Sequence, residues 1–222
     1  MSVSKERMLL AIPMKDPSDA KTRLGVSLTQ KQRGQLALSL FETVVERVQT
    51  VLQSMSPEQA QQRHIDIAVV SASPVLQDTA ARLGILFFAE GPRSGLSQAV
   101  SHLASQAHAQ GYSALCVLPG DLADPKLSDL RYLLSYPLDE QKVVICPSGD
   151  LGTNALMVPL PSPIDFGYGE RSFHLHYHAT IEAGMMPVVL PLTSLRMDVD
   201  TLVDLQYVPQ FHLDAALLGD GR

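Results

Sequence analysis

The chain has 222 residues, of which 45% are hydrophobic and 18% are charged, and its formal net charge is −6 at pH 7. This length and composition are typical of one globular domain with a substantial core, so we expect residues 1–222 to form a single domain. The negative charge excludes a general binder of nucleic acid or of anionic membranes, because both functions need a basic face.

Two features of the sequence bear on the location of the protein. Cys116 and Cys146 lie in apolar, strand-like runs without the spacing of metal ligands, which predicts buried and reduced thiols. Only five apolar residues lie between Arg7 and Pro13, which is too short for a signal peptide, and no apolar run approaches the length of a membrane span. We therefore expect a cytoplasmic protein without a membrane partner.

Short apolar runs alternate with segments of helical periodicity along the chain. The strands that we expect cover residues 8–12, 65–70, 85–88, 114–118, 143–146, 155–158 and 188–190. The helices that we expect cover residues 29–52, 73–84, 96–110 and 172–183, with a short helix from Thr201 onward. Helix ends are marked by a capping-box spacing at Thr29 and Gln32 and by a stop at Gly84.

Strands that alternate with helices predict right-handed crossover connections. The fold class that follows is α/β, with a mostly parallel, doubly wound sheet. Two closely spaced strands between residues 143 and 158 predict a small antiparallel insertion late in this sheet. In such a sheet, ligands bind at the carboxyl ends of the strands.

Cations cluster in the loop that follows the first predicted strand. The stretch AIPMKDPSDAKTRL carries Lys15, Lys21 and Arg23 within nine residues of an acidic chain. Because the loop leaves the carboxyl end of a strand, we predict that these side chains hold a triphosphate. The alternative is a solvated basic loop, which is the usual explanation for any single lysine.

Carboxylates occupy two further loops of the same kind. Asp121 follows a predicted strand in LPGDL, and Asp198 and Asp200 lie in MDVD. In an extended segment, residues two apart face the same side, so Asp198 and Asp200 can point at one ion. One or two carboxylates together with phosphate oxygens suit Mg²⁺. The alternative for Asp198 or Asp200 is the N-cap of the helix expected from Thr201.

Glycines and hydroxyls form a third group of motifs. GTN at residues 152–154 and GYGERSF at residues 167–173 combine glycines with Thr153 and Ser172, and Ser172 starts a helix. Backbone N–H groups and hydroxyls in this arrangement predict a small anion site, with a turn and a helix cap as the alternative. We predict that His174, His176 and His178 are surface histidines, because residues two apart do not share a helix face.

Together these motifs resemble the 2-phospho-L-lactate guanylyltransferase family of coenzyme F-420 biosynthesis. The marks are AIPMKDPSDAKTRL, LPGDL, GTNAL, GERSF and DVDT, in this order along nearly the whole chain. The resemblance implies a GT-A-like nucleotidyltransferase fold. The implied reaction transfers GMP from GTP to a phosphorylated three-carbon acid and releases pyrophosphate. The acid is 2-phospho-L-lactate, phosphoenolpyruvate or 3-phosphoglycerate, depending on the family member.

The resemblance also implies roles for residues at matching positions. Those implied to hold Mg²⁺ are Asp121, Asp198 and Asp200. Those implied to bind the GTP phosphates are Lys15, Lys21 and Arg23, with Gly95, Leu96 and Ser97 near the guanine. Those implied to bind the acceptor acid are Thr153, Gly169 and Ser172, with Gly167 as the alternative to Gly169. Catalysis is expected to depend on Lys15, Lys21 and Asp121.

The chain departs from the family pattern at two places. It has LPGDLADP where the family usually has LPADLP, and GLS where the family usually has GLN near the base. One alternative function is a nucleotidyltransferase with another base or acceptor, such as a cytidylyl- or molybdopterin-type enzyme. A second is a non-catalytic nucleotide-binding protein, which is expected to have lost a metal aspartate. The sequence leaves a homodimer open.

Overall fold

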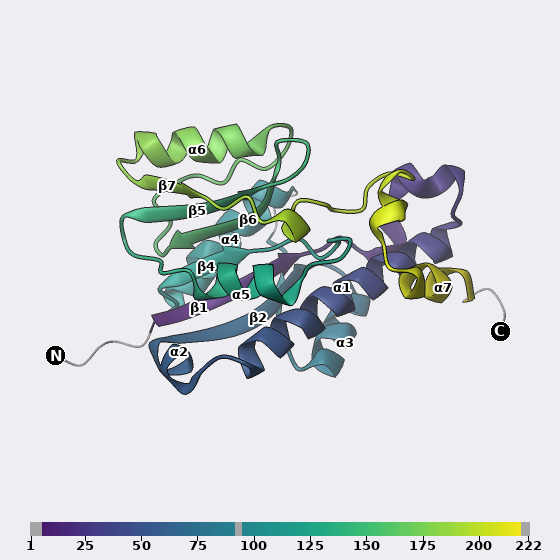
Figure 1. Cartoon of the computed structure of the whole chain (residues 1–222), viewed down its shortest axis with the longest axis horizontal. Helices are drawn as coiled ribbons and strands as arrows, with labels where there is room; N and C mark the ends of the chain where they lie inside the picture. Colours follow the sequence, from purple (N-terminus) through teal and green to yellow (C-terminus); the bar gives the residue numbers. More distant parts are fainter. Residues whose placement is uncertain (1–5, 92–94, 219–222) are drawn as a thin grey trace.

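A computed structural model describes residues 6–91 and 95–218 of the chain. The strands are β1 (Glu6–Pro13), β2 (Arg63–Ser71), β3 (Leu86–Ala89), β4 (Ala114–Val117), β5 (Lys142–Pro147), β6 (Thr153–Pro159) and β7 (Met186–Val189). They form one sheet in the order β3-β2-β1-β4-β6-β5-β7 (Figure 1). β6 is antiparallel to both of its neighbours, and the other pairs are parallel. The predicted α/β fold is confirmed, and the antiparallel insertion is the single strand β6.

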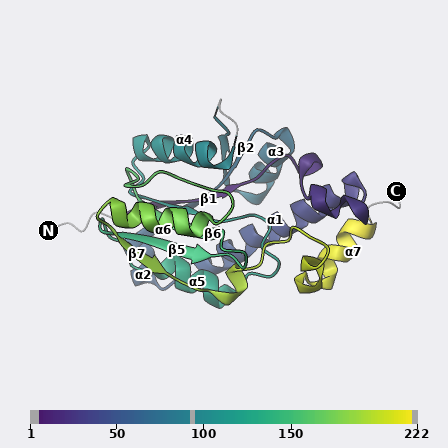
Figure 2. The ribbon, with the colours of Figure 1, turned by 90° about the horizontal axis from the view of Figure 1, so that it is seen from above.

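Helices cover both faces of the sheet (Figure 2). They are α1 (Gln30–Gln53), α2 (Pro57–Gln62), α3 (Pro74–Leu83), α4 (Leu96–Ala109), α5 (Leu127–Ser135), α6 (Ser172–Glu182) and α7 (Gln210–Leu218). Short 3-10 turns are η1 (Pro17–Asp19), η2 (Thr22–Val26), η3 (Thr193–Leu195) and η4 (Asp204–Tyr207). Buried side chains of α1, α3 and α5 belong to one core cluster, and those of α4 belong to a second cluster on the opposite face.

Sequence signals at the helix ends act as expected in two long helices. The Thr29 hydroxyl accepts from the backbone N–H of Gln32, whose side chain accepts from the Thr29 N–H, so a complete capping box starts α1. α3 begins at Pro74 and ends before Gly84, which adopts a φ of 66°. A positive φ is strained for residues with a Cβ, which explains why a glycine ends this helix.

Three helices of the structure are absent from the sequence predictions: α2, α5 and α7. The helix predicted from Thr201 is a 3-10 turn at Asp204–Tyr207, and the α-helix starts later, at Gln210. α5 buries Leu130, Leu133 and Leu134, whose helical spacing was a usable signal after Pro125. No helix among residues 6–91 and 95–218 is long and apolar enough to cross a membrane.

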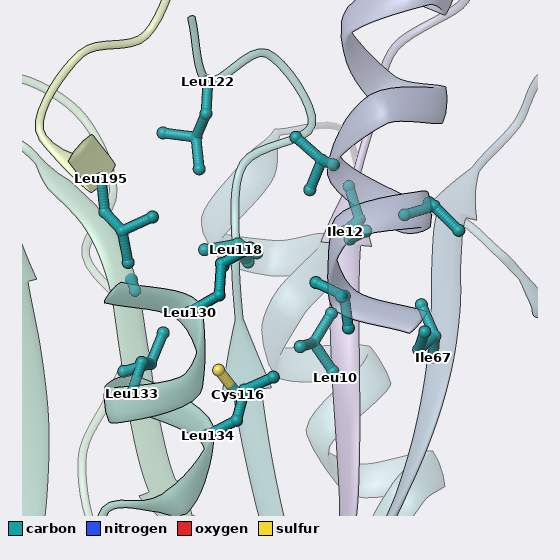
Figure 3. Close-up of a cluster of buried hydrophobic side chains, with 14 of the residues drawn as sticks. Leu10, Ile12, Ile67, Cys116, Leu118, Leu122, Leu130, Leu133, Leu134 and Leu195 are labelled. Atoms are coloured by element: carbon teal, nitrogen blue, oxygen red, sulfur yellow. The ribbon is translucent and has the colours of Figure 1, made fainter. Parts of the chain in front are cut away.

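Packing fixes the loops that carry the predicted site residues. Leu118 and Leu122 are buried on either side of Asp121 and lie in the core with Leu195 of η3 (Figure 3). Leu24 and Val199 are fully buried in a third cluster, in which the start of α1 meets α7. Each charged loop is therefore held by apolar side chains next to its charged residues.

Candidate active site

A cavity of about 470 Å³ lies at the carboxyl ends of β1 and β4. The predicted site residues that line it are Lys15, Lys21, Arg23, Gly95, Leu96, Asp121, Thr153, Asp198 and Asp200. Among the described residues, Ser97, Gly169 and Ser172 are outside this lining, although Ser172 contacts Thr153. The structure thus brings together loops that are separated by up to 185 positions in the sequence.

The loop after β1 folds back toward the sheet through polar contacts of its own. The carboxylate of Asp16 accepts from the backbone N–H of Ser18 at 2.9 Å and from the Ser73 hydroxyl at 2.5 Å. These hydrogen bonds lower the pKa of Asp16, with the bond from Ser73 contributing most. Lys21 adopts a left-handed conformation, with φ 56° and ψ 37°, which is uncommon for a residue with a Cβ.

The ammonium of Lys21 lies among carboxylates rather than in solvent. Its side chain is 4% exposed, its Nζ donates to Oδ2 of Asp121, and it lies 3.5 Å from Oδ1 of Asp200. The guanidinium of Arg23 lies 3.4 Å from the other carboxylate oxygen of Asp200. The solvated-loop alternative therefore fails for Lys21, whereas Lys15 and Arg23 are exposed.

Asp198 is a third carboxylate of the same cavity, and we call Lys21, Asp121, Asp198 and Asp200 the carboxylate cluster. The Oδ1 atom of Asp198 accepts from Nδ2 of Asn154 at 3.3 Å, and the same amide donates to the Leu195 carbonyl at 2.9 Å. Burial raises the pKa of Asp198, and the negative charges of Asp121 and Asp200 raise it further.

Asp198 and Asp200 alternate with a buried apolar residue. Val199 lies between them and is fully buried, and both aspartates line the cavity, as period-two alternation requires. The capping contacts of the next turn belong to Asp204, whose carboxylate accepts from the backbone N–H groups of Asp200 and Thr201 at 3.0 and 2.7 Å. The cap is therefore supplied by Asp204, and Asp198 and Asp200 remain available to a ligand in the cavity.

The oxygen donors of the carboxylate cluster fit one particular kind of metal binding. The described residues contain no group of three or more His, Cys, Asp or Glu side chains that could hold a metal ion unaided. Mg²⁺ needs no such group, because one or two carboxylates, phosphate oxygens and water usually complete its coordination. Three carboxylates and one buried ammonium carry excess negative charge, so the donor set fits Mg²⁺ that binds together with a nucleotide. The magnesium site itself stays a prediction.

Two hydroxyls and a histidine form a second cluster, which we call the hydroxyl cluster (Thr153, Ser172 and His176). The Ser172 hydroxyl donates to Oγ1 of Thr153 at 3.2 Å, and Nδ1 of His176 lies 3.0 Å from the same oxygen. The backbone N–H of Gly167 donates to Nε2 of His176 at 3.1 Å. Thr153 thus connects this cluster to the cavity that it lines.

The prediction of three surface histidines is wrong for His176. Its exposed fraction is 0%, whereas His174 and His178 are exposed as predicted. The buried positions of α6 are Ser172, His176 and Thr180, which are four residues apart and share one helix face. Because these three residues are polar, the sequence shows no apolar stripe that would mark this helix face as buried. Burial lowers the pKa of His176 to about 4, so the ring is neutral at neutral pH.

Comparisons with known proteins identify the family of this chain. A family model described as "Guanylyl transferase CofC like" matches residues 8–212. The chain belongs to this family. It is 34% identical over 200 residues to a 3-phospho-D-glycerate guanylyltransferase of Colwellia psychrerythraea, with 90% of each chain covered. It is 30% identical over 198 residues to a phosphoenolpyruvate guanylyltransferase of Rubrobacter xylanophilus, covering 87% of this chain and 89% of the relative.

A solved structure supports the fold of this CofC-like chain. The structure of a nucleotidyl transferase from Methanothermobacter thermautotrophicus has a TM-score of 0.59 at 14% identity, covering 95% of this chain and 99% of that one. The predicted family, the nucleotidyltransferase type of fold and the enzyme class are thereby confirmed. The roles of individual residues stay predictions.

The departures from the family pattern have structural correlates in this CofC-like chain. At Gly120 of LPGDL, an added Cβ would lie 3.0 Å from Cγ2 of Ile12 and 3.2 Å from Cδ2 of Phe41, both in the core. Ser97 of GLS uses its hydroxyl to accept from the backbone N–H of Tyr168 at 2.8 Å. Ser97 thus joins the start of α4 to the loop before α6, and a contact with guanine stays a prediction.

Sequence reasoning missed several residues of the site. Asn154 and Tyr168 line the cavity, and each lies in a motif that was noticed for a neighbouring residue. Glu90 also lines the cavity from the loop after β3, which continues into residues 92–94, outside the described residues. Of the two glycine candidates, Gly169 has a φ of 140° and is exposed, whereas Gly167 contacts His176. The choice between them stays open.

Proposed function

We propose that this chain transfers GMP from GTP to a phosphorylated three-carbon acid, with Mg²⁺ as the cofactor. The observation that carries the proposal is the meeting of three chemistries in one cavity. These are exposed cations for phosphates, carboxylate oxygens for a metal, and Thr153, whose hydroxyl accepts from that of Ser172 behind it, for a small anion. The named relatives at 34% and 30% identity act on 3-phospho-D-glycerate and phosphoenolpyruvate, which supports an acceptor of this class.

The proposed reaction needs positioning and charge neutralisation rather than a covalent nucleophile. An oxygen of the acceptor's phosphate attacks the α-phosphorus of GTP, the bond from that phosphorus to the bridging oxygen breaks, and pyrophosphate leaves. Lys15 and Arg23 are exposed at the cavity, where Lys15 can turn toward the phosphates and Arg23 can do so by leaving Asp200. Bound Mg²⁺ would supply charge neutralisation for the phosphoryl oxygens.

Lys21 and Asn154 hold the aspartates in place for this reaction. Lys21 is nearly inaccessible and bonds to Asp121, and Asn154 orients Asp198 from the neighbouring strand β6. A hydrogen bond or ion pair to each carboxylate lowers the cost of gathering three like charges. We also propose a cytoplasmic location, supported by the free, buried thiols of Cys116 and Cys146.

Pyrophosphate release tests the proposal directly. The purified protein is incubated with Mg²⁺, one of GTP, ATP, CTP or UTP, and one of 2-phospho-L-lactate, phosphoenolpyruvate or 3-phosphoglycerate. We expect release with GTP and at least one acid, and none with GTP alone. Release that is faster with CTP would place the chain with the cytidylyltransferases. No release with any pair would support the non-catalytic alternative.

A further inference from the structure

The imidazole of His176 has a proton position that its neighbours dictate. Its Nε2 lies 3.1 Å from the backbone nitrogen of Gly167, which only donates, so Nε2 must offer its lone pair. In a neutral ring the proton then resides on Nδ1. Nδ1 lies 3.0 Å from Oγ1 of Thr153 and therefore donates to it. The histidine is fully buried, so water does not compete for either nitrogen.

The hydroxyl of Thr153 receives two hydrogen bonds in this arrangement. One comes from Nδ1–H of His176 and the other from the Ser172 hydroxyl, at 3.2 Å. A hydroxyl oxygen has two acceptor sites and one O–H donor. With both acceptor sites filled, the hydroxyl of Thr153 has only its O–H left, and Thr153 lines the cavity. The group that it presents to a ligand is therefore a donor.

We propose that His176 is a positioning residue that makes Thr153 an obligate hydrogen-bond donor toward the anionic oxygens of the acceptor acid. This inference rests on the proposed function, and it adds a selection rule to it. A phosphate or carboxylate oxygen accepts a charge-assisted hydrogen bond from Thr153, a neutral hydroxyl accepts a weaker one, and an ammonium at the same point finds no lone pair. The site thus favours ionised acids over uncharged analogues of the same shape.

The structure also explains why the histidine holds one orientation. Gly167 lies in the loop before α6, and His176 lies within that helix. The hydrogen bond from the Gly167 N–H to Nε2 of His176 therefore joins the loop to the helix. The Tyr168 ring packs edge-on to the imidazole at a centroid distance of 5.0 Å. Rotation of the imidazole would break the hydrogen bonds at both nitrogens. The hydrogen bonds from Gly167 to His176 and from His176 to Thr153 therefore keep one direction.

Nitrogen NMR of the imidazole tests the hydrogen-bond direction in the protein without substrate. We expect the neutral tautomer with the proton on Nδ1 at pH 7. A proton on Nε2, or a charged ring at pH 7, would overturn the proposal. This measurement does not depend on turnover, so a failure of the proposed function and a failure of this inference are distinguishable.

Matched substitutions test the consequence for the acceptor. His176→Phe keeps a ring of similar size and removes both nitrogens, whereas His176→Asn keeps an amide that can still donate to Thr153. We expect His176→Phe to raise the KM for the acceptor acid about tenfold, with the KM for GTP unchanged. His176→Asn should raise the acceptor KM much less. Both variants leave the Gly167 N–H without the ring nitrogen. A purely structural role predicts the reverse order, because only Asn also leaves a void where the ring was.

A double-mutant cycle isolates the path through Thr153. Thr153→Val alone should raise the acceptor KM, and adding His176→Phe to it should raise that KM no further. Additive effects of the two substitutions would show that His176 acts by another path and would overturn the proposal. If His176→Phe does not fold, the wild-type tautomer and the His176→Asn variant still decide the matter.

Discussion

The carboxylate cluster and the hydroxyl cluster meet in one cavity, but their polar groups are held in different ways. In the carboxylate cluster, one buried ammonium is shared between Asp121 and Asp200, whose side chains are 33% and 48% exposed. In the hydroxyl cluster, neutral groups are bonded in a chain behind the cavity wall, with Ser172 2% and His176 0% exposed. The first arrangement suits ligands that bring and exchange charge, whereas the second fixes the direction of single hydrogen bonds.

This difference predicts which substitutions change catalysis and which change recognition. Arg23 and Asp200 are exposed, so their ion pair contributes at most about 1 kcal/mol to folding, whereas both charges face the cavity and act on bound phosphates. Buried neutral groups contribute to folding as well, since an unpaired buried donor costs about 1–3 kcal/mol. Separate measurements of folding and of each KM therefore distinguish the two clusters.

The largest expected effect is the loss of turnover in Asp121→Asn. The substitution preserves the shape of the side chain but removes a predicted metal ligand and the partner of Lys21. We expect kcat to fall by more than about a hundredfold, with a melting temperature close to that of the wild type. Asp139→Asn is the matched control, because Asp139 makes a surface ion pair with Lys142 outside the cavity lining. Near-normal turnover of Asp121→Asn in Mg²⁺ would show that the metal assignment of Asp121 is wrong.

A smaller effect is expected at the cations of the loop after β1. Lys15→Ala and Lys21→Ala should raise the KM for GTP about tenfold or more, because each removes a charge near the phosphates. Lys21→Ala should be the more severe, since it also leaves the carboxylate cluster without its ammonium. Lys142→Ala serves as the control, and the readout is steady-state kinetics with GTP varied. Unchanged kinetics with GTP in both variants would show that these lysines do not bind the phosphates and would support the alternative of a solvated basic loop.

The burial of His176 in the hydroxyl cluster should make the free energy of unfolding depend on pH. His176 has a pKa of about 4 in the folded protein, against about 6.5 in an unfolded chain. The unfolded state therefore binds the proton first, so the contribution of this residue is full above about pH 6.5 and declines as the pH falls toward 4.

Urea unfolding at pH 7 and pH 5 measures this contribution. Between these pH values the wild type should lose about 2 kcal/mol more than His176→Phe. The difference between the two proteins cancels the opposite contribution of Asp198, whose raised pKa favours the folded state at low pH. Equal losses in the two proteins would show that His176 titrates normally.

The fold could be predicted from the sequence where local signals and periodicity agreed. α1 has a capping box and valines and leucines every four residues, and α3 runs from Pro74 to the turn at Gly84. α5 was not predicted although its leucines have helical spacing, because it is only nine residues long and Lys126 provides no side-chain cap at its start. The loops of the site were also predictable, since ligands of such sheets bind at strand ends.

The hydrogen bonds and ion pairs within the site could not be predicted, because they join residues that are far apart in the chain. Lys21 pairs with Asp121 across 100 positions, and no local pattern shows that this cation is buried. His176 looked like a surface residue because its buried neighbours on α6 are also polar. The two hydrogen-bond partners of the His176 ring, Thr153 on β6 and the Gly167 N–H, come from other segments and are brought to it by the fold.

The central claim is that one cavity has a nucleotide side and an acceptor side that are served by separate residues. Its most direct test measures the KM for GTP and the KM for the acceptor acid in Lys15→Ala and in Thr153→Val. The account predicts a crossed result: Lys15→Ala raises the KM for GTP, and Thr153→Val raises the KM for the acid about ten- to a hundredfold. An equal rise of both constants in Thr153→Val would place its hydroxyl in the nucleotide pocket and contradict the division.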